Sequence, residues 1–363
     1  MPKNEASRYY SQSIFPHTSS GAKSLRSGKF ISHLSTSTHS RFSAKGDKCC
    51  CNGGLYLGVD GGATKTVAMI SDCSGRVLAT AKAGPSNPDN VGLEISIKNT
   101  VEAISKALDL LPNKQKISST FIGWAAVEES FRDKKEEIKK GILKYSGTRL
   151  IKDGRIIVGS DQIVAFRSGS TEKNGVILIA GTGCVSHGWN NGKEYKTSGW
   201  GWLEDQGSGF WVGQEVYRRV YEDMDKRGRK TNLTKALFEA TNTKCAEDLM
   251  AYVYTGSPMT TVPSFSLICD QVARKGDKVA IEILKTAGKN LIVSTLNVVR
   301  KLKFRNEFPI VLVGSLFKSD IVLNTVTVGL KKFGCGAKII VPECEPVVGA
   351  LRLAMEGYTC DAR

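Results

Sequence analysis

The amino-acid sequence predicts a duplicated α/β fold. Two stretches share one outline: GGLYLGVDGGATKTVAMISDCSGRVLATAKAG and NGVILIAGTGCVSHGWNNGKEYKTSG each predict three strands, with a glycine-rich turn after the first. The two turns, Asp60–Lys65 and Gly181–Cys184, lie about 120 residues apart, and helices and strands follow each meander. Glycine-rich hairpins can recur by coincidence, but a repeated order of elements is typical of a duplicated fold.

The remaining elements follow from hydrophobic periodicity and turn residues. The first half predicts a helix at about 94–111, a strand at 119–125, an amphipathic helix at 131–145, a strand at 155–161 and a short helix at 161–169. The second half predicts a long helix at about 278–303, a strand at 308–313, a helix from near Phe317, a strand at 337–343 and a last helix at 345–356 with Pro346 in its first turn.

Length and composition predict an ordinary globular protein of two domains. The chain has 363 residues, 41% hydrophobic and 24% charged, and no apolar run reaches the roughly 18 residues that a membrane helix needs. Its net charge of +16 suits a polyanionic substrate such as ATP as well as nucleic acid. No zinc-finger or RNA-binding signature favours nucleic acid. We therefore expect no membrane and no specific nucleic-acid partner, and a homodimer stays open.

Residues 1–52 predict a disordered basic leader. They hold eight Lys or Arg against two acids, are rich in Ser and Thr, and show no periodic apolar face. The composition fits an organelle transit peptide, and a solvated tail or a gene-model artefact fits as well. We expect an N-terminal domain at 53–170 and a C-terminal domain at 171–363, with the last helix able to pack back on the N-terminal domain.

The ten cysteines do not predict a disulfide framework. They are scattered over a long chain, and Cys49–Cys51 are adjacent, which is poor geometry for pairing among themselves. Acylation or metal binding by this triplet is an alternative. Unpaired cysteines indicate a compartment that keeps thiols reduced. We therefore expect a cytoplasmic protein unless the leader directs it to an organelle.

The stretch GVDGGATKT at 58–66 predicts a phosphate-binding hairpin. Glycines let backbone N–H groups approach an anion, hydroxyls donate to its oxygens, and a carboxylate can hold Mg²⁺. Two familiar phosphate loops do not match, because Ala63 stands where Walker A needs glycine and Asp60 stands where the dinucleotide fingerprint needs one. A structural turn is the alternative.

Asp161 stands between the strand RIIVGS and the short helix. A carboxylate at this point can cap the helix, which is the simplest interpretation of the residue by itself.

Four motifs together carry a resemblance to a known family. GVDGGATKT, LIAGTGC, VLVGSLFKS and EPVVGALRLA, in this order, resemble the actin-like sugar kinase superfamily with its ribonuclease H-like domains. Within it, the sequence is similar to the N-acetylglucosamine kinase branch, which groups with the activators of benzoyl-CoA reductase. The resemblance covers residues 54 to 357. It implies two domains around a nucleotide and sugar cleft, with ATP and Mg²⁺ as cofactors.

The resemblance implies a nucleotide site built from both glycine turns. In the first turn, Asp60 would hold Mg²⁺ through water, and Gly62, Thr64 and Lys65 would meet the phosphates, although a solvated lysine is an equal alternative. In the second turn Gly181, Thr182 and Gly183 would contact ATP. Gly314 and Ser315 of VGS would hold the adenosine, and Ala273 of ARKGD would lie by the base.

The resemblance also implies a sugar site and a catalytic base. Asp161 would take the proton from the attacking sugar hydroxyl, which suits phosphoryl transfer because that reaction depends mainly on positioning and charge stabilisation. The sugar would meet Asn87 of GPSN, the loop Gly199, Trp200 and Gly201, and the carboxylate of Asp205. Core packing is the alternative for Trp200, Trp202 and Trp211.

Two segments depart from the family pattern. After the tryptophan loop the family usually has G-D-E-G-S, but this chain has GWGWLEDQGSGFW, with Glu204 for a glycine and Gln206 for a glutamate. The spacing from Gly201 to Asp205 is also one residue shorter, which could displace Asp205. GWAAVEE at 123–129 differs from the glycine-rich stretch usual there.

The resemblance predicts an ATP-dependent kinase that converts N-acetyl-D-glucosamine, or a close amino sugar, to its 6-phosphate. The altered loop keeps open a catalytically weak sugar-binding regulator with the same fold. A reductase activator with an iron–sulfur cluster is a further alternative, for which Cys184 is the only cysteine inside a motif. Only the net positive charge supports the hypothesis of a nucleic-acid-binding protein.

Overall fold

The computed structural model describes residues 54–125, 127, 132–334 and 336–359. The expected disordered leader, the Cys49–Cys51 triplet and part of the GWAAVEE segment lie outside the described residues. Among the described helices, none is long and apolar enough to cross a membrane.

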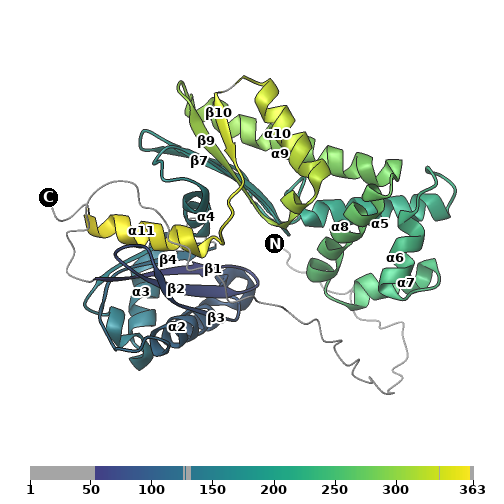
Figure 1. The fold of residues 1–363 in the computed structure, drawn as a ribbon. Coiled ribbons are helices and arrows are strands. Elements are labelled where there is room, and N and C mark those ends of the chain that lie inside the picture. Colours follow the sequence, from purple (N-terminus) through teal and green to yellow (C-terminus); the bar gives the residue numbers. More distant parts are fainter. Residues whose placement is uncertain (1–53, 126, 128–131, 335, 360–363) are drawn as a thin grey trace, which may run out of the picture. The chain divides into compact units, whose positions relative to one another are not determined.

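Two five-stranded sheets organise the described chain, and both have the same topology (Figure 1). The first has the order β3-β2-β1-β4-β5, and the second has the order β10-β9-β6-β7-β8. In each sheet an antiparallel meander of three strands is extended by two parallel strands beside its first strand. The predicted duplication of an α/β unit is confirmed.

The strands lie at the expected positions, although the strand expected over 337–343 ends at Ile340 and the one expected over 155–161 ends at Ser160. In the first sheet they are β1 (Leu55–Gly61), β2 (Thr66–Asp72), β3 (Val77–Ala83), β4 (Ile117–Trp124) and β5 (Arg155–Ser160). In the second they are β6 (Gly175–Ala180), β7 (Cys184–Asn190), β8 (Lys193–Ser198), β9 (Phe308–Val313) and β10 (Ala337–Ile340).

Helices of the first half and the chain's last helix surround the first sheet. They are α1 (Pro88–Val91), α2 (Leu93–Asp109), α3 (Lys135–Leu143), α4 (Asp161–Gly169) and α11 (Val347–Thr359), with 3₁₀ turns η1 (Arg132–Lys134) and η2 (Ser146–Ile151). The helix expected over 131–145 is shorter, because η1 precedes it and α3 ends at Leu143. The last helix begins one residue after Pro346, whose carbonyl accepts from Gly349 N.

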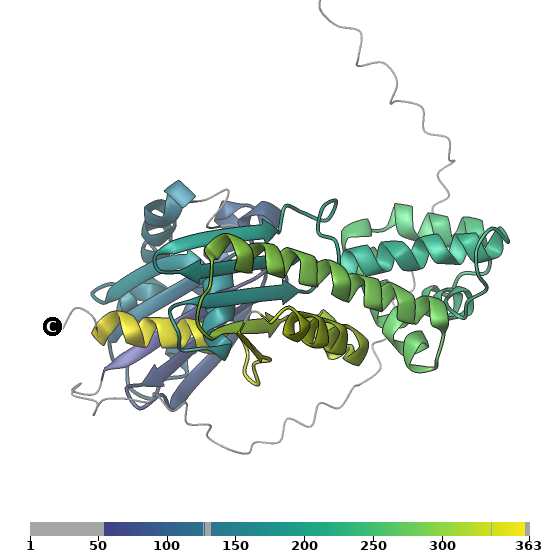
Figure 2. The ribbon, with the colours of Figure 1, turned by 90° about the horizontal axis from the view of Figure 1, so that it is seen from above.

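The second half adds a block of helices beyond its sheet. They are α5 (Gly209–Met224), α6 (Leu233–Thr241), α7 (Ala246–Thr255), α8 (Pro258–Arg274), α9 (Lys278–Leu302) and α10 (Asp320–Lys332), with η3 (Ser315–Lys318). The helix expected from Phe317 begins at Asp320 instead, because η3 comes first. Figure 2, seen from above, shows α9 as a long rod in this half.

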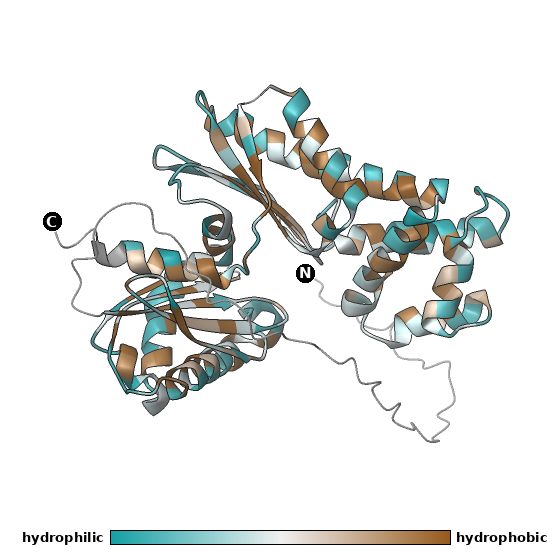
Figure 3. Cartoon of the chain, in the orientation of Figure 1, coloured by the Kyte–Doolittle hydropathy of each residue, from teal (hydrophilic) through white to brown (hydrophobic). Residues whose placement is uncertain are grey.

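Each half has its own apolar core. The larger one gathers side chains from β6, β9, α5, α8, α9 and α10, and the smaller one lies between the first sheet and α2 and α3. Brown and teal alternate along α9 in Figure 3, because one face of this helix is buried while the other meets solvent.

The last helix crosses to the first half and covers the other face of its sheet. Ala350, Leu351 and Ala354 of α11 form a buried cluster with Tyr56 of β1 and Phe121 of β4. The crossing is close: a Cβ on Gly58 would lie 2.3 Å from Leu351 N, so only glycine fits there. The first sheet therefore depends on residues from the end of the chain.

Candidate active site

The first glycine-rich turn is a tight hairpin tied to the GPSN loop. Gly62 N donates to Lys65 O at 3.0 Å and closes the turn between β1 and β2. Ser86 N donates to Gly62 O at 3.1 Å, and the buried Thr66 Oγ1 donates to Ser86 Oγ at 2.8 Å. The turn and the loop thus form one unit, with the Thr64 side chain exposed at its tip.

The loop holds Asn87, the expected sugar ligand, directly beside this hairpin. The Asn87 side chain accepts from Asp89 N at 3.0 Å and caps α1. Because its Oδ1 is used as the cap, its amide nitrogen is the part suited to a ligand. Its contact with a sugar stays a prediction.

Glycine is required at Gly61 by close packing. A Cβ there would lie 2.4 Å from Ser86 Oγ and 2.6 Å from a ring carbon of Trp124. Ala125 N also donates to Gly61 O. Gly61, Ser86, Thr66 and Trp124 were not among the predicted site residues. The glycine cluster was the sequence signal for Gly61 and Thr66, whereas Ser86 and Trp124 come from distant segments.

Strand register places two carboxylates at one edge of the first sheet. Gly61 at the end of β1 pairs with Trp124 of the parallel β4, and Trp124 pairs with Ser160 of the parallel β5. Asp60 and Asp161 therefore stand at the carboxyl ends of strands that are two spacings apart, which is about 10 Å. The carboxyl ends of parallel strands are the usual ligand-binding edge of α/β sheets.

Ser160, and not Asp161, caps α4. Ser160 Oγ accepts from Ile163 N at 3.3 Å, and Asp161 is the first helical residue. The capping interpretation of Asp161 is therefore wrong. Its carboxylate is half-buried in the first turn of the helix, where the helix dipole favours negative charge.

Asp60 is the residue of the first hairpin suited to a cation. Burial raises its pKa to about 6, while nearby Lys65 lowers the pKa and Glu345 raises it. A bound cation would favour the ionised form of this carboxylate. Among the described residues no group of three or more His, Cys, Asp or Glu could hold a metal ion. Mg²⁺ usually binds one or two carboxylates together with waters and phosphates, and its binding at Asp60 stays a prediction.

Lys65 has a carboxylate partner in the structure. Its Nζ lies 3.5 Å from Glu345 Oε1, and both side chains are about half exposed. An exposed pair of this kind contributes little stability and can open to admit a phosphate. Glu345 lies just before α11, so the segment leading into the last helix reaches the first hairpin, and sequence reasoning did not find it.

The second glycine-rich turn rests on the start of α5. Gly209 N donates to Gly181 O at 2.7 Å, and Phe210 N donates to Thr182 O at 3.0 Å. Gly181 N donates to Gly183 O at 2.9 Å and closes the turn. Thr182 is exposed at the tip, as Thr64 is in the first turn.

The VGS segment lies beside this second turn. A Cβ on Gly314, whose φ is +126°, would lie 2.1 Å from Ala180 O at the end of β6. The start of the predicted adenosine segment therefore meets the second hairpin at one sheet edge, and Ser315 follows it at the start of η3.

Ala273 is buried near the end of α8, next to the same segment. Its neighbour Arg274 donates to Lys318 O at 3.2 Å and pairs with Asp320 at 3.1 Å. The two segments expected around the adenosine are thus neighbours, and their contact with a base stays a prediction.

Asp205 holds the tryptophan loop to the second hairpin. Its Oδ2 accepts from Cys184 N at 3.2 Å, and its Oδ1 accepts from Gly199 N at 3.0 Å and Trp200 N at 3.2 Å. The side chain is only 5% exposed, and burial raises its pKa even though these three backbone hydrogen bonds lower it. In this structure the Asp205 carboxylate therefore holds the backbone amides of Cys184, Gly199 and Trp200 in place.

The aromatic side chains of the loop project outward. Trp200 is 69% exposed and lies under Lys196 Nζ at 4.1 Å from its ring centroid, and Trp202 is 43% exposed. Core packing is therefore wrong for Trp200, whereas the Trp202 ring lies 5.0 Å from that of the core residue Phe210 and Trp211 packs against the larger core. Gly199 and Gly201 have φ of +77° and +107°, a region that favours glycine.

One buried contact ties the start of α4 to β7. His187 Nδ1 lies 2.6 Å from Gln162 Oε1, and both side chains are buried. Gln162 follows Asp161, and β7 begins at the second hairpin, so this pair joins elements that carry site residues from both halves. Sequence reasoning missed it, because no pattern links residues 25 positions apart.

Comparison with known proteins agrees with this architecture. The model of the BadF/BadG/BcrA/BcrD ATPase family matches residues 57–354. An N-acetyl-D-glucosamine kinase from Dictyostelium discoideum is 29% identical over 318 residues, covering 83% of this chain and 98% of that protein. An N-acetylmuramic acid/N-acetylglucosamine kinase from Clostridium acetobutylicum is 31% identical over 255 residues, covering 69% of this chain and 81% of that protein.

A solved structure shows the same fold. A crystal structure from Chromobacterium violaceum, with an inferred N-acetylglucosamine kinase assignment, superposes with a TM-score of 0.63 at 21% identity and covers 83% of this chain and 99% of that chain. This likeness supports the actin-like sugar kinase fold. Because the family model matches most of the sequence and both sheets carry the expected hairpins, the chain belongs to the BadF/BadG/BcrA/BcrD ATPase family.

Proposed function

We propose that this protein transfers the γ-phosphoryl group of ATP to the 6-hydroxyl of N-acetyl-D-glucosamine or a close amino sugar. The register of β1, β4 and β5 carries the proposal, because it aligns Asp60 and Asp161 at the edge where the Gly62–Lys65 turn lies. The amino-sugar kinases among the relatives support the acceptor class.

In this mechanism Asp161 orients the sugar hydroxyl and accepts its proton. The hydroxyl oxygen forms a bond to the γ-phosphorus while the bond to the bridging oxygen breaks, and ADP leaves with that oxygen. Phosphoryl transfer needs in-line positioning more than strong base catalysis, so a carboxylate at a rigid helix start suits the task. Bound Mg²⁺, held at Asp60, would neutralise charge on the phosphates.

The two hairpins would bind the phosphate chain by the same chemistry. Each presents an exposed threonine and a glycine backbone at its tip, which are donors for phosphate oxygens. Gly314, Ser315 and Ala273 would hold the adenosine. Asn87 and the loop Gly199, Trp200 and Gly201 would hold the sugar, with Asp205 fixing the loop's backbone.

A coupled assay of ADP release tests the proposal. Purified full-length protein is incubated with Mg-ATP and N-acetylglucosamine, glucosamine, N-acetylmuramic acid or glucose, and the phosphorylated product is located by NMR. We expect release that depends on an N-acetylated amino sugar and a phosphate on O6. An absence of sugar-dependent release with every acceptor would contradict the proposal.

The tryptophan loop favours a second candidate, a sugar-binding regulator with weak turnover. The Asp205 carboxylate already accepts three backbone hydrogen bonds, so few of its lone pairs remain to accept a hydrogen bond from a sugar hydroxyl. Calorimetry with N-acetylglucosamine separates the two candidates. Micromolar sugar binding combined with turnover no faster than that of Asp161→Asn would favour the regulator.

The described cysteines do not favour a cluster-bearing activator. Cys184, the cysteine inside a motif, is buried, and its thiol donates to Gln206 O. Burial, with Asp205 and Glu204 nearby, raises the pKa of this thiol, which disfavours the thiolate that a cluster needs.

A further inference from the structure

A polar cavity lies at the edge of the second sheet opposite to the second hairpin. Its volume is about 830 Å³, within the usual range for small-molecule sites. The lining comes from the segment after α4, the β7–β8 turn, the α9–β9 connection and β10. Asn174 precedes β6 and Gly181 follows it, so six strand residues, or about 20 Å, separate the cavity from the predicted nucleotide turn.

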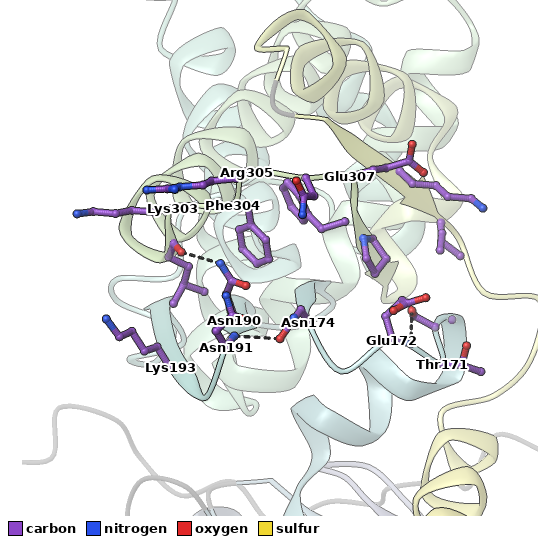
Figure 4. A pocket seen from close by; sticks show the side chains of 18 of the residues that line it. Thr171, Glu172, Asn174, Asn190, Asn191, Lys193, Lys303, Phe304, Arg305 and Glu307 are labelled. Carbon is purple, nitrogen blue, oxygen red and sulfur yellow. Dashed lines mark hydrogen bonds between the residues drawn. The ribbon is translucent and has the colours of Figure 1, made fainter.

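Five cationic side chains line this cavity and none is neutralised within the described chain. They are Lys193, Lys301, Lys303, Arg305 and Lys338, and the described residues give none of them an ion-pair partner. Only two acids, Glu172 and Glu307, share the lining. In Figure 4 the labelled Lys193, Lys303 and Arg305 lie toward one end, and the two glutamates lie toward the other. One end of the cavity thus presents concentrated positive charge.

Two asparagine side chains lie between the two ends of the cavity, and each has an amide group that is still able to bind a ligand. Asn190 Nδ2 donates to Leu302 O at 2.9 Å, which leaves its oxygen as an acceptor. Asn174 Oδ1 accepts from Asn191 N at 3.0 Å, which leaves its nitrogen as a donor. A fixed acceptor beside a fixed donor suits hydroxyl groups, which both donate and accept. Phe304, stacked on Phe308 at 3.9 Å between centroids, supplies an apolar surface for a sugar ring face.

Lys303 of the cavity lining has a backbone conformation that favours glycine. It ends α9 in the left-handed region, with φ of 53°, where glycine is the usual residue. A lysine in this conformation is less favourable than glycine. The same position provides a sharp test, because glycine removes the charge while relieving the strain.

We propose that this cavity binds a phosphorylated sugar at a second site, separate from the predicted active site. Lys193, Lys303 and Arg305 take the phosphate, and the asparagine amides take ring hydroxyls. The helix α4 carries Asp161 at its first residue and ends at the cavity with Gly169, so the site adjoins an element of the predicted catalytic edge. The binding proposal does not depend on the kinase assignment.

Calorimetry with the full chain tests this site while the other site is filled. The protein is saturated with N-acetylglucosamine and a non-hydrolysable ATP analogue, then titrated with glucose 6-phosphate. We expect one further equivalent to bind, with inorganic phosphate at least about tenfold weaker and glucose weaker still, since the charge and hydroxyl contacts each contribute. No further equivalent, or equal affinity for inorganic phosphate, would overturn the proposal.

Variants locate the binding. Lys303→Gly should raise the Kd for glucose 6-phosphate about tenfold while Tm stays equal or rises, which excludes unfolding as the cause. Arg305→Ala should weaken binding similarly. Lys98→Ala and Lys114→Ala, at exposed lysines of the first half, are matched controls that should bind normally. Equal losses of affinity in the cavity variants and the control variants would show non-specific charge attraction and would contradict a site at this cavity.

Discussion

Asp161 and Thr182 are the single residues on which the proposed chemistry depends most. Asp161 starts a helix whose cap is supplied by Ser160, so its carboxylate can change with little loss of the cap. Thr182 sits at an exposed turn whose carbonyl, and not its hydroxyl, ties it to α5. Replacing Asp161 leaves the Ser160 cap in place, and replacing Thr182 leaves its backbone hydrogen bond in place, which helps to separate kinetic effects from loss of these two contacts.

Asp161→Asn should lower kcat by roughly 10²- to 10⁴-fold, because the amide cannot accept the hydroxyl proton. Affinity for ATP should stay near normal, since no nucleotide contact is predicted for this side chain. Steady-state kinetics and nucleotide calorimetry measure the two effects. A variant that keeps wild-type kcat would remove Asp161 from the role of base.

Thr182→Val should weaken ATP binding by about tenfold, because the isosteric side chain loses a hydroxyl donor to a charged phosphate. Affinity for the sugar should change less. Thr80→Val, at an exposed strand position in β3, is the control and should leave both affinities unchanged. The reverse order of losses would place the second hairpin at the sugar.

Candidate site residues were predictable where they lie together in one short stretch of sequence. The glycines, Asp60 and the two threonines could be found because each hairpin is local in sequence. The supports of the site could not, because Ser86, Trp124 and the His187–Gln162 pair meet only after distant strands and helices pack. The engagement of Asp205 with three backbone amides likewise follows from loop geometry that no spacing rule specifies.

At the scale of elements, α9 shows how one cap anchors a helix. Asp277 Oδ1 accepts from Val279 N and Ala280 N at 3.0 Å, and its Oδ2 accepts from Asn232 N at 2.8 Å. Burial raises the pKa of Asp277, but these bonds and the one from Thr231 outweigh it and hold the pKa below its ordinary value. The ionised form is thus favoured by folding.

Asp277→Ala should lower the free energy of unfolding by about 2 kcal/mol at neutral pH. Because the folded pKa is depressed, the contribution is complete above the unfolded pKa of 3.8 and fades as pH falls below it. Urea unfolding of both proteins between pH 7 and about 2.5 measures this. Asp109→Ala at an exposed helix end is the control; a difference between wild type and Asp277→Ala that grows on acidification would contradict the assignment.

The crossing of α11 over α4 depends on a glycine in the helix. A Cβ on Gly349 would lie 1.9 Å from Val164 O and 2.6 Å from Ser168 N, both backbone atoms that cannot move aside easily. Gly349→Ala should therefore destabilise the protein by about 1–3 kcal/mol, although alanine is the better helix former. Thermal unfolding measures the loss. Gly181→Ala, with no atom within 4 Å of its Cβ, should leave Tm unchanged.

Elements were predictable because their signals are local, whereas their partners were not. Alternation and turn residues predicted both meanders, and Asp277 followed by helical periodicity predicted α9. The boundary errors at η1 and η3 arise where a 3₁₀ turn precedes an α-helix. The last helix was expected to be able to pack back on the N-terminal domain, but no local pattern specifies that α11 covers β1, because that contact joins segments almost 300 residues apart in the sequence.

At the scale of the whole molecule, the family match and the described fold both begin near residue 54. Removing residues 1–50 should therefore change kcat by less than about twofold and Tm by only a few degrees, because β1 and all later elements are kept. Kinetics and calorimetry of the shortened protein measure this. Removal of residues 1–61, which deletes β1, is the control that should abolish folding. A large loss from the first deletion would assign the leader a structural role.

The closure of the first sheet by the last helix has a consequence for biosynthesis. Tyr56 leaves the ribosome long before Leu351, its partner in the buried cluster. At about 5–20 residues per second the delay is on the order of 15–60 s, during which one apolar face of the nascent N-terminal half has no cover. Folding of that half must therefore wait until α11 has been synthesised, and chaperones that shield exposed apolar surface should be found on stalled chains that lack this helix.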